Sequence, residues 1–264
     1  MFEIECGSGL KFQARKWKLS DRKVLLNQKI AKQGRMLTEM LKVADLGLID
    51  PGPYTDSVFQ TGKPVPWDHV LVADIMSALI KLRACNSPTI EFHAPCENEQ
   101  CSSSKPMDVT IDVREIEIAP PSQTGLEHIR SGVPFTSTIH TDEGSVPLKL
   151  RLLKGSDLST MRKYYDQDAL EGLDAQTILH IAEVQLPNGD VLERFVDIYK
   201  WYQDQSFEFN ESLLEALAPH GGKVDPVVDF ECPTCGHNNR VEVPFGPTFF
   251  IPRKNKPGSS MVTL

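Results

Sequence analysis

Four cysteines in two close pairs are the residues of this chain whose types and spacing best suit metal chemistry. Four residues separate Cys96 from Cys101, and two residues separate Cys232 from Cys235. Thiolates at such spacings bind zinc in knuckles, and one knuckle supplies two of the four ligands that tetrahedral zinc takes. The two pairs therefore predict one structural Zn²⁺ site to which both contribute.

The second pair carries the stronger signal. In the run Cys232-Pro233-Thr234-Cys235-Gly236-His237, the glycine lets the backbone curl so that N–H groups point at both sulfurs. No glycine follows Cys101, so the first knuckle is less well defined. The candidates to replace a failing thiolate are His237, His93 and His220. A histidine beside a cysteine pair more often lies on the surface.

Other chemistries for the cysteines stay open but fit less well. Thioredoxin-like redox pairs open a helix after a strand, a context that the Cys232 pair lacks. A pair without metal is a second alternative. A catalytic zinc is disfavoured, because four thiolates leave no position for water and no glutamate is placed as a general base. Cys6 and Cys85 stand alone and are expected to be buried.

Signatures of catalysis and of membrane insertion are absent from the sequence. No nucleophile elbow, zinc-protease helix, phosphate-binding loop or dinucleotide fingerprint occurs. We therefore expect no enzyme, no catalytic residue and no small-molecule substrate. No stretch reaches the ~20 apolar residues that span a bilayer, and the first residues lack a secretory signal, so we expect a cytosolic protein without a membrane partner.

The segments that must position the cysteine pairs repeat along the chain. Four residue types, Arg, Lys, Ser and Asp, recur at a separation of 136 residues: Arg15, Lys18, Ser20 and Asp21 match Arg151, Lys154, Ser156 and Asp157. The first cysteines of the two pairs, Cys96 and Cys232, have the same separation. Two markers in one register indicate an internal duplication. In each copy, a short alternating strand runs into Ser-Asp, whose side chains are expected to cap a following helix.

Helices and strands are then expected in a similar order in both copies. The first copy has an apolar helical stripe from Val24 to Leu48 and a second helix over 69–84, whose shorter counterpart covers 210–217. Alternating strands flank each cysteine pair. The prediction is an α+β fold of two related halves, each with short strands, one or two helices and a zinc-knuckle hairpin. The expected divisions are a first repeat 1–118, a linker 119–135, a second repeat 136–252 and a polar tail 253–264.

Charge is unevenly distributed along the chain. The formal net charge of the 264 residues is −8 at pH 7, yet ten Lys or Arg and two acids occupy the stretch from Lys11 to Lys42. Such a stretch suits docking to an acidic protein surface or to a phosphate backbone, but a solvated basic helix face explains it without any partner.

Aromatic residues and prolines gather near the C-terminus. We expect Phe245, Phe249, Phe250 and Pro252 to form an extended segment with an apolar edge that binds a partner.

The runs from Asp229 to His237 and from Val241 to Phe245, followed by Phe249-Phe250-x-Pro252, resemble the C-terminal signature of the baseplate hub assembly chaperones of contractile-tailed bacteriophages of the T-even type. The segment from Val146 to Arg151, with Ser-Asp downstream, is similar to the middle of that family. The chain departs from the family pattern in its C-x4-C spacing and in the shortened helix of the second half.

This resemblance implies a non-enzymatic phage protein that builds the central hub of the tail baseplate or stays within it. It implies contacts with other tail proteins such as the tape measure, in the host cytoplasm during assembly and in the virion if the protein is retained. The alternative is a zinc-ribbon protein that binds nucleic acid, or is associated with transcription, through the basic stretch 11–42.

Overall fold

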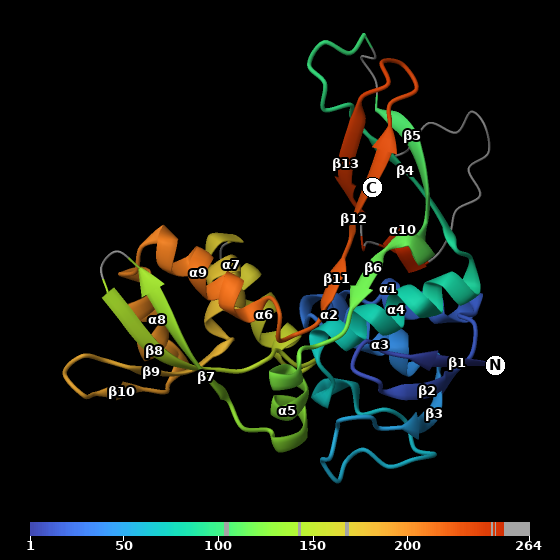
Figure 1. Cartoon of the computed structure of the whole chain (residues 1–264). Helices are drawn as coiled ribbons and strands as arrows, with labels where there is room; N and C mark the ends of the chain where they lie inside the picture. The colour runs from blue at the N-terminus through green and yellow to red at the C-terminus, as the bar shows by residue number, and fades with distance from the viewer. Residues whose placement is uncertain (103–105, 142–143, 167–168, 244, 246, 251–264) are drawn as a thin grey trace.

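The structure of this chain is a computed structural model that describes residues 1–102, 106–141, 144–166, 169–243, 245 and 247–250 (Figure 1). Helices account for 36% of the residues and strands for 27%, in small sheets, so the expected α+β class is confirmed. The chain forms an N-terminal lobe, a second lobe and an arm that projects away from both (Figure 1). Pro252 and the expected tail 253–264 lie outside the described residues.

The N-terminal lobe is an antiparallel sheet covered by helices. Its elements are β1 (Phe2–Glu5), β2 (Lys11–Ala14), η1 (Leu19–Asp21), α1 (Arg22–Leu25), α2 (Gln28–Lys32), α3 (Met36–Lys42), β3 (Asp45–Asp50), η2 (Trp67–His69) and α4 (Val72–Asn86). The strand order is β1-β2-β3, and alternation along β2 buries Phe12 and Ala14. Helix α4 packs against β1 and buries Ile75 and Leu79 in the core.

The single helix expected from Val24 to Leu48 is wrong, because the structure divides this stretch. Asn27 accepts hydrogen bonds from the N–H groups of Lys29 and Ile30 and so starts a new helix, α2. Gly34 has φ +65°, a conformation that ends α2. The last residues of the stretch then extend as β3 and pair with β2. The apolar stripe thus predicted burial correctly, but not a continuous helix.

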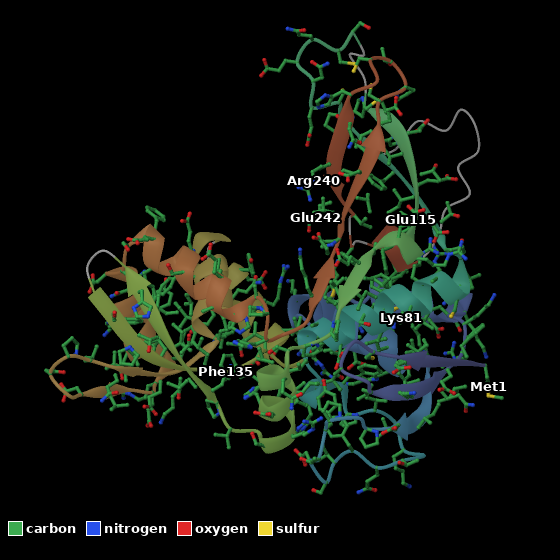
Figure 2. The ribbon with its side chains drawn as sticks, in the orientation of Figure 1. Met1, Lys81, Glu115, Phe135, Arg240 and Glu242 are labelled. Carbon is green, nitrogen blue, oxygen red and sulfur yellow. The ribbon has the colours of Figure 1, made fainter. Side chains whose placement is uncertain are left out.

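The second lobe has the same general design. Its elements are β7 (Phe135–Thr141), β8 (Gly144–Leu150), α6 (Asp157–Tyr165), α7 (Ala169–Ile178), β9 (Ile181–Gln185), β10 (Val191–Leu192), α8 (Phe195–Gln203) and α9 (Phe207–Leu217). The strand order is β10-β9-β8-β7. Helix α9 packs on β7 and buries Phe209 and Leu213. Lys81 on α4 and Phe135 on β7 mark the two lobes in Figure 2.

The two sheets agree in hydrogen-bond register. Phe12 pairs with Leu48, and the residues 136 positions later, Leu148 and Val184, pair in the same way. Both strand pairs then shift register one residue before the end of the first strand. Beyond each shift, a backbone N–H donates to a carbonyl across the sheet, at 2.9 Å from Arg15 to Ala44 and at 2.8 Å from Arg151 to His180.

The repeated Arg and Asp residues make the same contacts in both lobes. Arg15 and Asp21 pair at 2.8 Å, and Arg151 and Asp157 pair at 2.9 Å. Each aspartate also accepts a hydrogen bond from the backbone N–H of the repeated lysine, at 2.7 Å from Lys18 and at 2.9 Å in the second lobe. The expected capping of α1 and α6 by Ser-Asp is not seen, because neither N-cap side chain, Asp21 or Ser156, accepts a hydrogen bond from its helix. Asp21 instead acts at the start of η1, where its carboxylate accepts the N–H of Lys18, the residue before that helix.

Backbone contacts join the two lobes. The N–H of Val72 donates to the carbonyl of Leu153 at 2.9 Å, and the N–H of Ser156 donates to that of Asp68 at 2.9 Å. Buried apolar residues of both lobes belong to one contiguous core. Within the described part of the chain, no helix has both the length and the apolar character needed to cross a membrane.

The arm consists of two β hairpins side by side (Figure 1). Its elements are β4 (Thr89–Ala94), β5 (Met107–Asp112), η3 (Val113–Glu115), β6 (Glu117–Ala119), β11 (Lys223–Asp225), β12 (Val227–Glu231) and β13 (Asn238–Glu242). Strand β4 pairs with β5 and β12 with β13, while β6 pairs with β11 near the lobes. Figure 2 marks Arg240 and Glu242 on β13 and Glu115 on η3. Strands from both halves therefore build this arm.

The expected linker 119–135 is instead ordered and packed. It contains α5 (Gln123–Ser131), which Ser122 caps by accepting the N–H of Gly125. A Cβ added at Gly125 would lie 1.9 Å from the carbonyl oxygen of His220, so only glycine permits this approach. The Ser122 hydroxyl also lies 2.7 Å from Nδ1 of His220. The prolines and polar residues that suggested a linker therefore begin a capped helix.

The C-terminal aromatic segment folds into the N-terminal lobe. Residues Pro247–Phe250 form the short helix α10, so the expected extended segment is wrong. Phe249 and Phe250 are buried, and Phe250 meets the Trp17 ring edge-on at 5.4 Å. Nε of the buried Arg83 donates to the carbonyl of Phe249 at 2.6 Å. Both rings are therefore buried in the chain's own core rather than on an extended apolar edge.

Candidate metal centre

The tips of the two arm hairpins bring the four predicted cysteines together. Sγ of Cys96 lies 3.7 Å from Sγ of Cys235, and Sγ of Cys101 lies 3.8 Å from Sγ of Cys232. All four sulfurs lie within 4.8 Å of one another. Each close pair contains one sulfur from each half of the chain. The prediction that these residues form one shared cluster is therefore consistent with the structure.

The spacing of the sulfurs fits a tetrahedral metal ion. Zn–S bonds of about 2.3 Å in a tetrahedron place the ligand sulfurs about 3.8 Å apart. The two close contacts match this edge length, and the remaining pairs need only small movements to reach it. Four thiolates would complete the coordination of the ion and leave no position for water.

The second knuckle has the backbone curl that its sequence predicts. Gly236 adopts φ +69°, and its N–H donates to the carbonyl of Cys232 at 2.8 Å. The N–H of Cys232 in turn donates to the carbonyl of His237 at 2.8 Å. The N–H groups of Thr234 and Cys235 point at the Cys232 sulfur. Such donors stabilise a thiolate and orient it for a metal.

The first knuckle reaches a similar result without glycine. The backbone N–H of Asn98 points at the Cys96 sulfur, and the side-chain Nδ2 of Asn98 lies 3.7 Å from Sγ of Cys235. The backbone carbonyl of Asn98 accepts the N–H of Cys101 at 2.9 Å, and its side-chain Oδ1 accepts the N–H of Gln100 at 3.0 Å. Asn98 thus folds the longer C-x4-C loop around the cluster.

The metal-free cluster divides its protons unequally. Desolvation opposes ionisation of Cys232, but the N–H groups of Cys235 and Thr234 outweigh it and lower the pKa of Cys232 to about 6. Desolvation, together with the neighbouring thiols, raises the pKa of Cys96 to about 12. One thiol is thus ionised at neutral pH while another keeps its proton. A metal that binds all four as thiolates must displace that proton.

Asn239 joins the two knuckles and was missed by sequence analysis. It is fully buried on β13, where its Oδ1 accepts the N–H of Glu97 at 2.7 Å and its Nδ2 donates to the carbonyl of His237 at 2.9 Å. Asparagine is uncommon in strands, and this one takes an inward position in the alternation. That combination is the signal by which the sequence could have identified it.

The cluster is buried on one side only. Cys232 is 1% exposed and its Sγ lies 3.2 Å from the sulfur of Met107, whereas Cys235 is exposed. A bound ion would therefore lie near the surface of the arm tip. Solvent access on that side would allow a chelator to reach it.

The histidines considered as substitute ligands are not in the cluster. His93 pairs with Asp108 at 2.8 Å, and Nδ1 of His220 lies 2.7 Å from the hydroxyl of Ser122. His237 is exposed beside the second knuckle.

Comparison of the chain with protein-family models, with curated proteins and with solved structures finds no match in any of the three.

Proposed function

We propose that this chain is a non-enzymatic docking protein, that a structural zinc ion holds its arm together, and that it acts in building the baseplate hub of a contractile phage tail. The observation that carries the proposal is the four-cysteine cluster formed jointly by two hairpins from different halves of the chain. Such a cluster joins distant segments, which is a structural task.

Zinc is the metal that this ligand set supports best. Four thiolates in a tetrahedron select Zn²⁺ or iron, and hard cations such as Mg²⁺ and Ca²⁺ prefer oxygen ligands. A closed set of four ligands gives zinc no catalytic position. Elemental analysis of the purified chain separates the candidates, since we expect zinc and an iron content would contradict this choice.

We also propose that the two halves arose by duplication. In its support, the β2–β3 and β8–β9 pairs share one register at a separation of 136 residues, and the Arg–Asp contacts recur at the same separation. The arm hairpins do not keep this 136-residue separation. At the base of the first hairpin the backbone N–H of Val113 donates to the carbonyl of Pro88, and at the base of the second the N–H of Val243 donates to the carbonyl of Pro226. A loop of different length in each hairpin then brings the cysteines to one tip.

The phage role is supported by the sequence resemblance in the segments around Cys232 and Phe245. An arm clamped at its tip and lobes joined through backbone bonds give a rigid body that suits docking. We therefore propose that the partners are other tail and baseplate proteins, including the tape measure, met in the host cytoplasm, and that the protein acts without a small-molecule substrate.

Affinity purification tests this proposal. The tagged chain would be expressed with a full set of contractile-tail genes, and the proteins retained with it would be identified by mass spectrometry. We expect baseplate hub proteins with the wild-type chain, and fewer of them with the metal-site variant Cys96→Ser. Recovery of the folded wild-type chain without any tail protein would contradict the proposed role.

A nucleic-acid-binding role is the alternative that the basic stretch permits. Phosphate contacts are strongest at low salt, so a shift assay with duplex DNA and with RNA at low salt would reveal them. We expect no shift, because exposed leucines lie among the basic side chains and do not suit a phosphate backbone. A salt-sensitive shift would favour the alternative over the docking role.

A further inference from the structure

The basic stretch noted in the sequence forms an exposed surface. Six cations lie on or beside η1, α1 and α2, all of them exposed; they are Lys16, Lys18, Arg22, Lys23, Lys29 and Lys32. The nearest acid, Asp21, is buried and neutralised by Arg15. Leu19 and Leu26 are 75% and 74% exposed within this basic face. A surface that combines positive charge with exposed leucines attracts an acidic partner that also carries apolar side chains.

A cavity lies at one edge of the basic face. Its volume is about 300 Å³, and its lining includes Lys16, Lys18 and Arg22, the carboxylate of Asp21 that Arg15 pairs, and the rings of Trp17 and Phe250. Nε1 of Trp17 donates to the carbonyl of Met40 at 2.9 Å, which fixes the ring in the wall. The lining therefore combines aromatic rings with a net positive charge, and the cavity's size is enough for one large apolar side chain.

Helix α9 of the second lobe has the opposite character. Its outer face, the acidic face, carries Phe207, Glu208, Glu211, Leu214 and Glu215, all exposed. Phe207 is 92% exposed, while Phe209 and Leu213 on the inner side are buried. Apart from Met1, Phe207, Leu19 and Leu26 are the most exposed large apolar side chains among the described residues. The two faces thus carry the most exposed of these side chains.

We propose that a second copy of this chain docks its acidic face on the basic face, with Phe207 of the incoming helix seated in the cavity floored by Trp17 and Phe250. Both faces present two apolar residues seven positions apart, Leu19 with Leu26 and Phe207 with Leu214, flanked by charges of opposite sign. The basic cavity is in the N-terminal lobe and α9 is in the second lobe (Figure 1). The contact is separate from the cysteine cluster and does not depend on the phage role.

The proposed contact is head-to-tail, since the two faces are different surfaces. Each docked copy therefore keeps one unoccupied face, and association continues into a closed ring or an open filament. Opposite charges speed the encounter and set the register, while burial of Phe207 and the leucines supplies affinity. Because exposed charges are screened by salt, association should weaken as ionic strength rises.

Sedimentation of the full-length, metal-loaded chain tests the contact. We expect species larger than the monomer at about 50 mM NaCl and dissociation at about 500 mM NaCl. Lys18→Glu with Arg22→Glu, or Glu211→Lys with Glu215→Lys, should each weaken association at least about tenfold. Single charge reversals outside both faces, Lys63→Glu and Glu193→Lys, should leave association unchanged.

A mixture of the two charge-reversed proteins gives the sharpest result. Each variant alone carries two faces of the same sign and should associate weakly. In the mixture every face meets a face of opposite charge on the other variant, so association should return, which also shows that both variants are folded. A chain that carries both pairs of reversals should associate again. A wild-type monomer at low salt, no association in the mixture, or equal loss in the control variants would overturn the proposal.

Discussion

At the residue scale, the position of the two cysteine knuckles depends on Asn239, a side chain that is not one of the four candidate metal ligands. Asn239 satisfies the N–H of Glu97 in one knuckle and the carbonyl of His237 in the other. Its full burial means that no water replaces these bonds if the amide is removed. The four ligands are thus held in position by a buried hydrogen-bonded amide as well as by their own loops.

Replacing Asn239 should therefore loosen the site without removing a ligand. We expect Asn239→Ala to lower the free energy of unfolding by about 1–3 kcal/mol, because a buried donor and acceptor lose their partner. Zinc should still bind, but it should pass faster to a coloured chelator. Asn238→Ala, an exposed neighbour on the same strand, is the control. Equal release rates for the two variants would argue against the role of Asn239.

The unequal thiols predict how metal affinity depends on pH. At neutral pH Cys96, with its pKa raised to about 12, must release a proton when zinc binds, whereas Cys232, at about 6, is already a thiolate. Affinity should fall as pH falls, and should fall more steeply below about 6, where Cys232 also takes up a proton. Calorimetry in buffers of different ionisation enthalpy measures the protons released. Binding independent of pH would contradict this scheme.

At the element scale, the two Arg–Asp pairs fix the turn between each sheet and its first helix. Burial opposes ionisation of Asp21, but hydrogen bonds from Arg15 and from the N–H of Lys18 outweigh it and lower the pKa of this carboxyl. A lowered pKa adds stability that is present above the ordinary carboxyl pKa and is lost as pH falls through the folded-state value. The Arg15–Asp21 pair therefore stabilises the chain at neutral pH.

Removing one guanidinium tests this contribution. We expect Arg15→Met to lower the free energy of unfolding at pH 7 on the order of 1 kcal/mol, a modest figure since Arg15 is partly exposed and screened by water. The difference from the wild-type chain should shrink as the solution is acidified below about pH 4, where the Asp21 carboxyl of the unfolded chain takes up a proton, and should vanish once the folded carboxyl is protonated as well. Arg130→Met, on the exposed side of α5, should have little effect in denaturant titrations at either pH. A difference that persisted in acid would have another cause.

The C-terminal aromatic helix should act on stability. Phe249 is fully buried, so Phe249→Ala should cost about 3–5 kcal/mol, whereas Phe207→Ala, at a fully solvated ring, should change the free energy of unfolding little. Thermal or denaturant unfolding of both variants makes the comparison. A fully stable Phe249→Ala protein would show that α10 is not part of the core.

Sequence patterns predicted these elements to different degrees. Strands around the cysteines were predicted well, because apolar and polar residues alternate there as expected for strands with one buried face and one exposed face. The prediction of one long helix in the N-terminal lobe was wrong. Asn27 and Gly34 divide it through local hydrogen bonds and backbone angles that apolar periodicity does not detect. The aromatic run was placed outside the core because its partners, Trp17 and Arg83, lie far away in sequence.

At the scale of the whole molecule, the chain is joined at two places. Backbone bonds between residues 68–72 and 153–156 hold the lobes together, and the cysteine cluster closes the arm at its far end. The four cysteines of the cluster could be predicted from their spacing, whereas their pairing across hairpins could not, because it depends on loop lengths. With zinc in place, the arm hairpins would be joined at both ends.

Metal content measured by native mass spectrometry tests the shared site most directly, in the wild-type chain and in the variant Cys96→Ser. We expect one zinc ion per wild-type chain, with none or a weakly held ion in the variant, together with a lower unfolding temperature. Two ions per chain, no metal in the wild type, or a variant with unchanged zinc content and unfolding temperature would contradict one zinc held jointly by both halves.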